Sequence, residues 1–187
     1  MQGKKEFTVM IDDIERVLFT EEQLVQEVQE LGRKISRDYA GKEIFAVGIL
    51  KGAVIFFADL VRAIDVPVQL DFMIVSSYGN SSQTSGTVKI LKDLDYDIEG
   101  KHVLIIEDII DSGLTMNYLL KNFKQRNPAS VKLCALLSKP DRHTVDVNID
   151  YCGHEVPDEF LVGYGLDYAE KYRNLPCIGV LKKEIYV

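Results

Sequence analysis

Cysteine, long apolar runs and an excess of basic side chains are scarce or missing in this chain of 187 residues. The cysteines, Cys134, Cys152 and Cys177, are odd in number and show no C-x-x-C spacing, which favours reduced thiols over a disulfide framework. No apolar run approaches the roughly 20 residues of a membrane-spanning helix, and the stretch from Met1 to Glu6 is not followed by the apolar core of a signal peptide. These absences predict a cytoplasmic protein without a membrane partner.

Basic residues are outnumbered, with 22 Lys+Arg against 29 Asp+Glu and a formal net charge of -7. General nucleic-acid binding needs clustered Lys and Arg, because phosphate contacts dominate its affinity. The composition therefore argues against a nucleic-acid partner. Hydrophobic residues make up 47% of the chain, enough for a core at this length, and no repeat, low-complexity tract or linker divides it. We expect one domain over residues 1–187.

Helical and extended patterns alternate along the chain. Thr20-x-x-Gln23 has the form of a capping box, which predicts a helix start, and Gly41 is placed to end that helix. Buried parallel strands read as continuous apolar runs, whereas amphipathic helices carry apolar residues three or four apart. On these criteria we expect strands at 44–50, 66–75, 87–92, 103–106, 131–137, 151–156 and 178–181, with helices starting near 20, 53 and 115. The alternation predicts an α/β domain with a parallel core.

The stretch from Val103 to Thr115 says most about function. Its apolar run ends at two acids, Glu107 and Asp108, placed where ligands bind beyond the carboxyl ends of parallel strands. The loop Asp111-Ser-Gly-Leu-Thr115 then leads into a helix, and such a loop can wrap backbone N–H groups and hydroxyls around a phosphate. The pattern predicts acids for ribose hydroxyls beside a phosphate cradle. A lone Asp-x-x-Asp-x-Gly would be better interpreted as a solvated acidic turn before a capped helix. Here the apolar run, the acid pair, the third acid and the loop occur together and in order, which favours a functional site.

This order of features resembles the ribose-5-phosphate signature of the type I phosphoribosyltransferases, which bind 5-phosphoribosyl-1-pyrophosphate (PRPP). Leu50-Lys51-Gly52 resembles the pyrophosphate loop of that family, and Ser77-Tyr78 resembles its flexible catalytic loop. Lys139, in Leu-Leu-Ser-Lys-Pro, and the segment 157–173 resemble the base-binding parts of the purine-salvage branch. The resemblance covers most of the chain.

The resemblance implies the fold of the family, a central mostly parallel sheet flanked by helices, with a small hood subdomain formed by the N-terminal segment and residues 140–175. It implies transfer of the 5-phosphoribosyl group from PRPP to N9 of a 6-oxopurine, hypoxanthine or guanine, giving IMP or GMP and pyrophosphate. Mg²⁺ is the implied cofactor, and a homodimer or homotetramer is the implied assembly. The Leu50–Lys51 peptide bond is implied to be cis in at least some ligand states.

Residue roles follow from the same resemblance. Asp111 is the implied catalytic base, which takes the purine N7 proton. The implied PRPP-binding residues are Glu107, Asp108, Asp111, Ser112, Gly113, Leu114 and Thr115, and the implied pyrophosphate-binding residues are Lys51, Gly52 and Arg173. The purine is assigned to Lys139, Phe160, Leu161 and Asp167, and the metal to Asp167, Glu107 and Asp108. Ser77 and Tyr78 belong to the polar segment 76–86, which we expect to be mobile and to close over the substrates.

Two alternatives stay open. One is a relative specific for xanthine and guanine, because main-chain carbonyls can read the 2-position of the base. The other is a regulator on the same fold that binds RNA or DNA, which the acidic composition disfavours. Gly163-Tyr-Gly165 lacks the third glycine of a dinucleotide fingerprint, and the three histidines lack metal-ligand spacing.

Overall fold

The structure is a computed structural model that describes residues 10–78 and 87–187. Most of the segment predicted to be a mobile loop, residues 79–86, lies outside the described residues. The backbone of Ser77 and Tyr78 is described, as the end of a strand.

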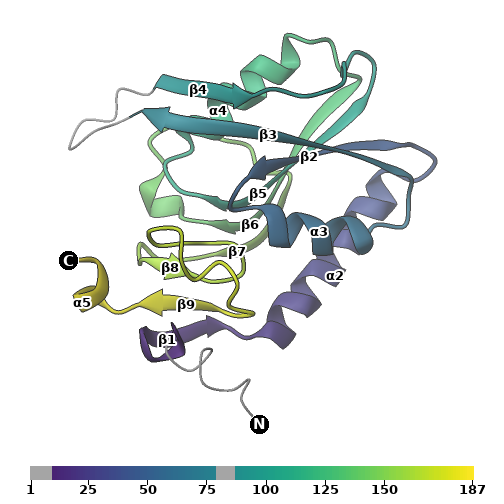
Figure 1. The fold of residues 1–187 in the computed structure, drawn as a ribbon. Helices are drawn as coiled ribbons and strands as arrows, with labels where there is room; N and C mark the ends of the chain where they lie inside the picture. The colour runs from purple at the N-terminus through teal and green to yellow at the C-terminus, as the bar shows by residue number, and fades with distance from the viewer. Residues whose placement is uncertain (1–9, 79–86) are drawn as a thin grey trace.

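A six-stranded sheet forms the centre of the molecule (Figure 1). Its strand order is β4-β3-β2-β5-β6-β7, and every neighbouring pair is parallel except β3 with β4. The strands are β2 (Ile44–Leu50), β3 (Val68–Tyr78), β4 (Thr87–Lys92), β5 (His102–Ile110), β6 (Ser130–Ser138) and β7 (Tyr151–Glu155). The predicted mostly parallel α/β fold is confirmed.

A second, antiparallel sheet of three strands lies at one end of the first, in the order β1-β9-β8 (Figure 1). Its strands are β1 (Ile14–Phe19), β9 (Ile178–Leu181) and β8 (Leu161–Val162), followed by the short helix α5 (Lys183–Tyr186). Only β9 was predicted as a strand. The apolar-run criterion misses the other two, because β1 carries mostly partly exposed or exposed residues and β8 is two residues long.

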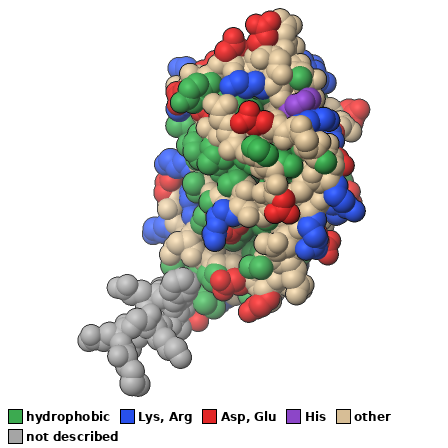
Figure 2. Space-filling view, turned by 90° about the vertical axis from the view of Figure 1, so that its right-hand side faces the viewer, with side chains coloured by type: hydrophobic (Ala, Val, Ile, Leu, Met, Phe, Trp, Pro, Cys, Tyr) green, Lys and Arg blue, Asp and Glu red, His purple; other side chains and the backbone are tan. Residues whose placement is uncertain are grey.

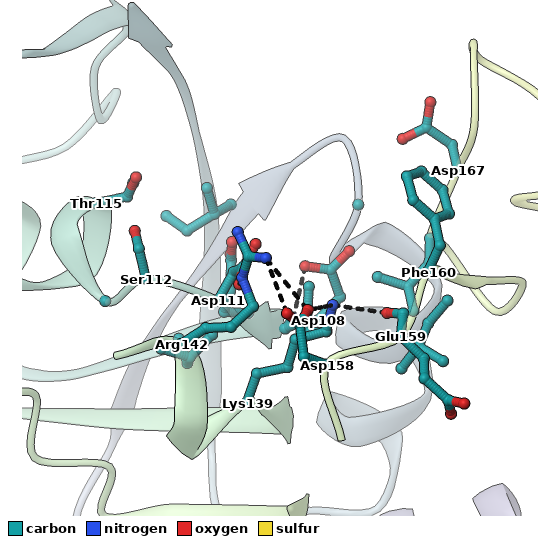
Figure 3. Close-up of a pocket in the computed structure, with 18 of the residues that line it drawn as sticks. Asp108, Asp111, Ser112, Thr115, Lys139, Arg142, Asp158, Glu159, Phe160 and Asp167 are labelled. Atoms are coloured by element: carbon teal, nitrogen blue, oxygen red, sulfur yellow. Dashed lines mark hydrogen bonds and ion pairs between the residues drawn. The ribbon is translucent and has the colours of Figure 1, made fainter. Parts of the chain in front are cut away.

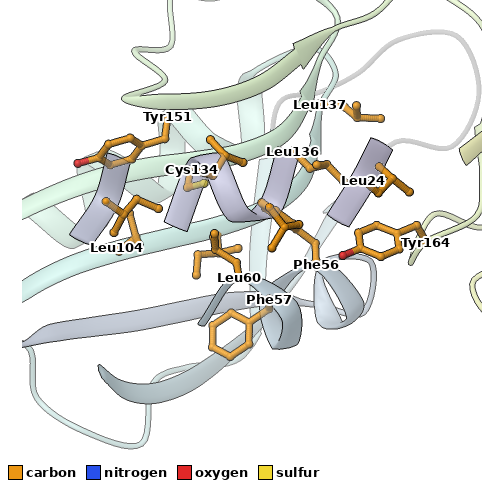
Figure 4. Close-up of a cluster of buried hydrophobic side chains, with 14 of the residues drawn as sticks. Leu24, Phe56, Phe57, Leu60, Leu104, Cys134, Leu136, Leu137, Tyr151 and Tyr164 are labelled. Carbon is orange, nitrogen blue, oxygen red and sulfur yellow. The ribbon is translucent and has the colours of Figure 1, made fainter. Parts of the chain in front are cut away.

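Helices cover both faces of the large sheet. On one face lie α2 (Glu21–Asp38) and α3 (Val54–Arg62), whose side chains share one buried cluster with the sheet (Figure 4). On the other face lies α4 (Leu114–Lys124), in a second cluster. The capping box that begins α2 is confirmed, since Thr20 and Gln23 each bond the backbone N–H of the other. The helix ends at Asp38, and Gly41 follows with a left-handed φ of 74°.

The strand that carries the acid pair is longer than predicted. β5 runs from His102 to Ile110, so Glu107 and Asp108 lie within the strand and not beyond its end. The backbone pairing with β6 sets the length of the strand, because Glu107 pairs with Ala135 and Ile110 pairs with Ser138 in the parallel ladder. Strand pairing depends on the main chain, so a polar side chain does not end a strand whose neighbour continues.

The surface carries mixed charges. On the face seen in Figure 2, Lys and Arg side chains are interspersed with Asp and Glu side chains. In the described part of the chain, no helix is long and apolar enough to cross a membrane.

A close contact between α2 and α3 gives a stability prediction. A Cβ at Gly32 would lie 2.4 Å from the Ala63 carbonyl oxygen and 2.7 Å from the Ala63 Cβ. Helix propensity alone favours Ala over Gly by about 1 kcal/mol, but overpacking costs about 1–3 kcal/mol. We therefore expect Gly32→Ala to lower the free energy of unfolding, measured by urea denaturation. Glu30→Ala, on the exposed side of the same helix, is the control and should change it by less than about 0.5 kcal/mol. A more stable Gly32→Ala variant would contradict the close packing.

Candidate active site

The parallel register of the large sheet brings three strand ends together. β2 pairs with β5 up to Gly48 opposite Ile106, and β5 pairs with β6 up to Ile110 opposite Ser138. A cavity of about 1070 Å³ opens at these ends and extends to the small sheet. Figure 3 shows Ser112 and Thr115 on one side of it and Phe160 and Asp167 on the other.

The loop after β5 is shaped to bind an anion. Gly113, the N-cap of α4, has a φ of 79° and makes no side-chain cap. The first N–H groups of a helix have no partner within the helix, and the helix dipole favours a negative charge beside them. The loop folds back on itself, with Leu114 N–H donating to Ser112 Oγ at 3.4 Å. Ser112, Gly113 and Thr115, the residues predicted to cradle a phosphate, all line the cavity.

The acid pair on β5 is buried and poorly compensated. Burial and the neighbouring Asp108 charge raise the pKa of Glu107 well above its usual range, and its buried Oε2 has no hydrogen-bond partner among the described residues. Burial also raises the pKa of Asp108 to about 6, against the opposing effect of a 2.8 Å hydrogen bond from Ile109 N–H. A cation or hydroxyl donors in the cavity would favour the ionised forms.

A charged network crosses the middle of the cavity, and Figure 3 shows it by dashed lines. Arg142 Nε lies 2.5 Å from Asp111 Oδ1, and Arg142 Nη1 lies 3.2 Å from Asp158 Oδ1. The buried Lys139 donates to the Glu159 carbonyl oxygen at 2.7 Å and lies 3.7 Å from Asp158 Oδ1. The ends of β5 and β6 are thereby joined to the segment that leads into β8.

The side of the cavity opposite the loop after β5 is formed by the residues around β8 (Figure 3). Phe160 stacks on Tyr186 of α5 with ring centroids 4.7 Å apart. Arg173 pairs with Asp167 at 2.9 Å and donates to the Gly165 carbonyl oxygen at 2.8 Å, while its buried Nε has no partner within the described part of the chain. This wall offers an aromatic face beside a carboxylate and a guanidinium.

Most residues predicted from the sequence line this one cavity: Gly52, Glu107, Asp108, Asp111, Ser112, Gly113, Thr115, Lys139, Phe160, Leu161, Asp167 and Arg173. Lys51 and Leu114, which are also described, do not. Lys51 Nζ instead pairs with Glu170 Oε2 at 3.0 Å, and the same oxygen lies 3.7 Å from Arg173. The Leu50–Lys51 peptide bond is cis, as the resemblance implied. The side chains of Ser77 and Tyr78 lie outside the described residues.

Sequence reasoning missed several residues of the cavity: Glu15, Arg142, Asp158, Glu159, Lys183 and Tyr186. Arg142 could have been predicted from the local sequence. Pro140 begins a 3₁₀ turn after Lys139, and in such a turn the side chain three residues after Lys139 lies over the end of the strand. The others reach the cavity only through the pairing of β1, β8 and β9, which the apolar pattern did not reveal.

Comparison with known proteins shows the family of the chain. A family model described as phosphoribosyl transferase domain matches residues 17–169, so the chain belongs to the phosphoribosyl transferase family. The hypoxanthine-guanine phosphoribosyltransferase of Bacillus subtilis (strain 168) is 54% identical over 178 residues, covering 95% of this chain and 99% of that protein. The enzyme of the same name from Streptococcus thermophilus (strain CNRZ 1066) is 53% identical over 174 residues, covering 93% and 97%.

Solved structures give the same result. A hypoxanthine phosphoribosyltransferase from Staphylococcus aureus superimposes with a TM-score of 0.93 at 47% identity, covering 96% of this chain and 97% of that one. A hypoxanthine-guanine phosphoribosyltransferase from Bacillus anthracis, solved with a HEPES molecule in the active site, gives a TM-score of 0.87 at 50% identity, covering 90% and 99%.

The contact between Gly52 and Asp108 gives a second prediction. A Cβ at position 52 would lie 2.0 Å from Asp108 Oδ2, so Gly52→Ala forces the buried carboxylate to move. We expect a loss of about 1–3 kcal/mol in the free energy of unfolding. The control is the same substitution in an Asp108→Ala background, where the clash is gone and the loss should shrink to less than about 0.5 kcal/mol. Equal losses in both backgrounds would place the strain elsewhere.

Proposed function

We propose that this protein transfers the 5-phosphoribosyl group of PRPP to N9 of hypoxanthine or guanine, giving IMP or GMP and pyrophosphate in purine salvage. The observation that carries the proposal is that three features meet in one cavity. They are the N-terminus of α4, where a phosphate can bind, the buried acids of β5, and the buried Lys139 with the aromatic ring of Phe160. The named relatives and the family support the same chemistry.

The phosphoribosyl group would lie along β5 and its loop. Ser112, Gly113 and Thr115 hold the 5-phosphate through main-chain N–H groups and the two hydroxyls. Leu114 does not line the cavity, and its N–H donates to Ser112 Oγ, so it supports the loop that holds the phosphate. Glu107 and Asp108 hold the ribose hydroxyls. When ionised, both acids also favour the positive charge that builds on the ribose as the anomeric C–O bond breaks.

Mg²⁺ fits the donors that this cavity offers. Glu107, whose Oε2 has no hydrogen-bond partner in the part of the chain that the structure describes, supplies carboxylate oxygens together with Asp108 and Asp167, and this is the ligand type that Mg²⁺ prefers. Among the described residues no group of three or more His, Cys, Asp and Glu side chains is arranged to hold a metal. The three carboxylates are therefore not grouped around one point, and we assign the ion to one or two of them together with the substrate phosphates. When bound, Mg²⁺ would neutralise the charge that develops on pyrophosphate.

The purine would lie between the Asp111 end and the Phe160 wall. Phe160 offers a stacking face, and Leu161 follows it along the same wall. Lys139 lines the cavity, and its ammonium uses one of its three N–H groups for the Glu159 carbonyl oxygen. Another N–H donates to O6 of the purine. A donor at this position disfavours adenine, whose 6-amino group is itself a donor. Asp111 takes the N7 proton as N9 attacks.

Pyrophosphate would meet Gly52, Lys51 and Arg173. The latter two share Glu170 as a partner, so pyrophosphate takes the place of that carboxylate between them. We assign the hood to the small sheet of β1, β8 and β9 with the turn at 163–175, so that one domain contains the whole site. A homodimer or homotetramer in the cytoplasm is the state we propose.

The direct test is a coupled assay of purine-dependent pyrophosphate release, with hypoxanthine, guanine, xanthine and adenine in turn and with Mg²⁺ present or chelated. We expect release with hypoxanthine and guanine, dependent on Mg²⁺, and none with adenine. Release with xanthine and guanine alone would favour the xanthine-guanine relative, and no release with any base would overturn the proposal.

The proton-transfer role of Asp111 predicts a loss of turnover. Asp111→Asn keeps the shape of the side chain but removes the base, so kcat should fall by about 10²–10⁴-fold. PRPP binding, measured by calorimetry, should stay near that of the parent protein. Normal turnover in the variant would eliminate Asp111 as the base.

The O6 contact of Lys139 predicts a selective effect on the base. Lys139→Ala should raise KM for hypoxanthine and guanine by about tenfold or more and leave KM for PRPP nearly unchanged. Lys132→Ala is the matched control, because Lys132 pairs with Asp38 and does not line the cavity. Equal rises in KM for base and PRPP would indicate that Lys139 is structural.

A further inference from the structure

Arg142 connects the proposed base to the segment that carries the base-binding wall. Its Nε lies 2.5 Å from Asp111 Oδ1, and its Nη1 lies 3.2 Å from both Asp158 oxygens. Asp111 follows β5, Arg142 lies in a one-turn 3₁₀ helix, η1 (Pro140–Arg142), directly after Lys139, and Asp158 precedes β8. Three segments distant in the sequence therefore meet through one guanidinium.

Stability does not account for this arrangement. The side chains of Arg142, Asp111 and Asp158 are 46%, 50% and 52% exposed, and ion pairs at such positions contribute about 0–1 kcal/mol. A contribution of that size does not need a bridging arginine in the centre of a cavity. A position beside the reacting atoms is a better explanation than a role in folding.

The geometry fixes the carboxylate of Asp111. A free aspartate turns readily about its last side-chain torsion, which is broad and has no sharp preferred value. A guanidinium that contacts Oδ1 and is itself held by Asp158 restricts that rotation, because its planar fork is rigid. The second oxygen can then keep a constant direction into the cavity. Proton transfer needs such alignment, since a misplacement of about 1 Å can cost 10²-fold in rate.

We propose that Arg142 is a positioning residue that holds the Asp111 carboxylate for proton transfer from the purine, with Asp158 as its anchor. The inference rests on the function proposed above and adds a residue to it. The segment at Asp158 also holds the Lys139 side chain in position, because the carbonyl oxygen of the next residue, Glu159, accepts a hydrogen bond from the Lys139 ammonium at 2.7 Å. One segment therefore aligns both the residue that reads O6 and the residue that takes the N7 proton.

A double-mutant cycle on kcat tests this. Arg142→Gln should lower kcat by about tenfold in the parent protein, with KM for PRPP changed by less than about twofold. In an Asp111→Asn background the same substitution should change kcat by less than about twofold, because there is no longer a base to align. Arg142→Lys, which keeps a cation near Asp111, should recover at least about threefold of the loss.

Asp158→Asn provides a second, independent variant, and circular dichroism with urea unfolding confirms that each variant is folded. We expect Asp158→Asn to lower kcat and, through Lys139, to raise KM for the base. An equal fall in kcat on Arg142→Gln in both backgrounds, no fall in the parent, or no recovery with Arg142→Lys would overturn the positioning role. These outcomes are distinguishable from failure of the proposed function, in which the parent protein shows no purine-dependent pyrophosphate release.

Discussion

The in-register parallel pairing of β2, β5 and β6 is the constraint on which the site depends. Parallel strands end at the same edge of a sheet, so the residues that follow each strand meet there. Gly48 opposite Ile106 and Ile110 opposite Ser138 bring together the loops after three strands. A shift of one residue would turn the Glu107 and Asp108 side chains to the opposite faces of the sheet. Helices cover both faces of the sheet, and the apolar side chains of these strands are buried against them. This burial holds the register of the strands.

Close backbone contact then joins the small sheet to this edge. A Cβ at Gly165 would lie 2.1 Å from the Gly52 carbonyl oxygen, and Gly165 has a φ of 105°, so neither the space nor the backbone admits a larger residue. Gly52 in turn touches Asp108. The turn after β8, the loop after β2 and the acid of β5 therefore form one continuous contact. At Gly165 and Gly52 the two main chains meet with no side chain between them, so this part of the contact holds the two loops at a fixed distance.

The sequence predicts the large sheet well because its signals are local. The bounds of β2, β4 and β9 agree with the predicted ranges, since apolar runs and turn residues mark their ends. The sites on β5 and its loop follow from the same local pattern. The contacts that complete the site do not, because Arg142, Asp111 and Asp158 meet only when three strand ends and the small sheet have assembled. β1 and β8 are recognisable through their pairing with β9, which is a tertiary property.

An acidic chain that binds an anionic substrate must place its few cations with care. The net charge is -7, yet Lys139, Arg142, Arg173 and Lys183 all line the cavity. Each of the three that pair with acids meets a carboxylate of the site: Lys139 and Arg142 meet Asp158, and Arg173 meets Asp167. A paired cation gives less attraction at long range than a free one, but it is held in position before the ligand arrives. For Arg173, the pyrophosphate that we propose would replace the Glu170 carboxylate, with little reorganisation of the guanidinium itself.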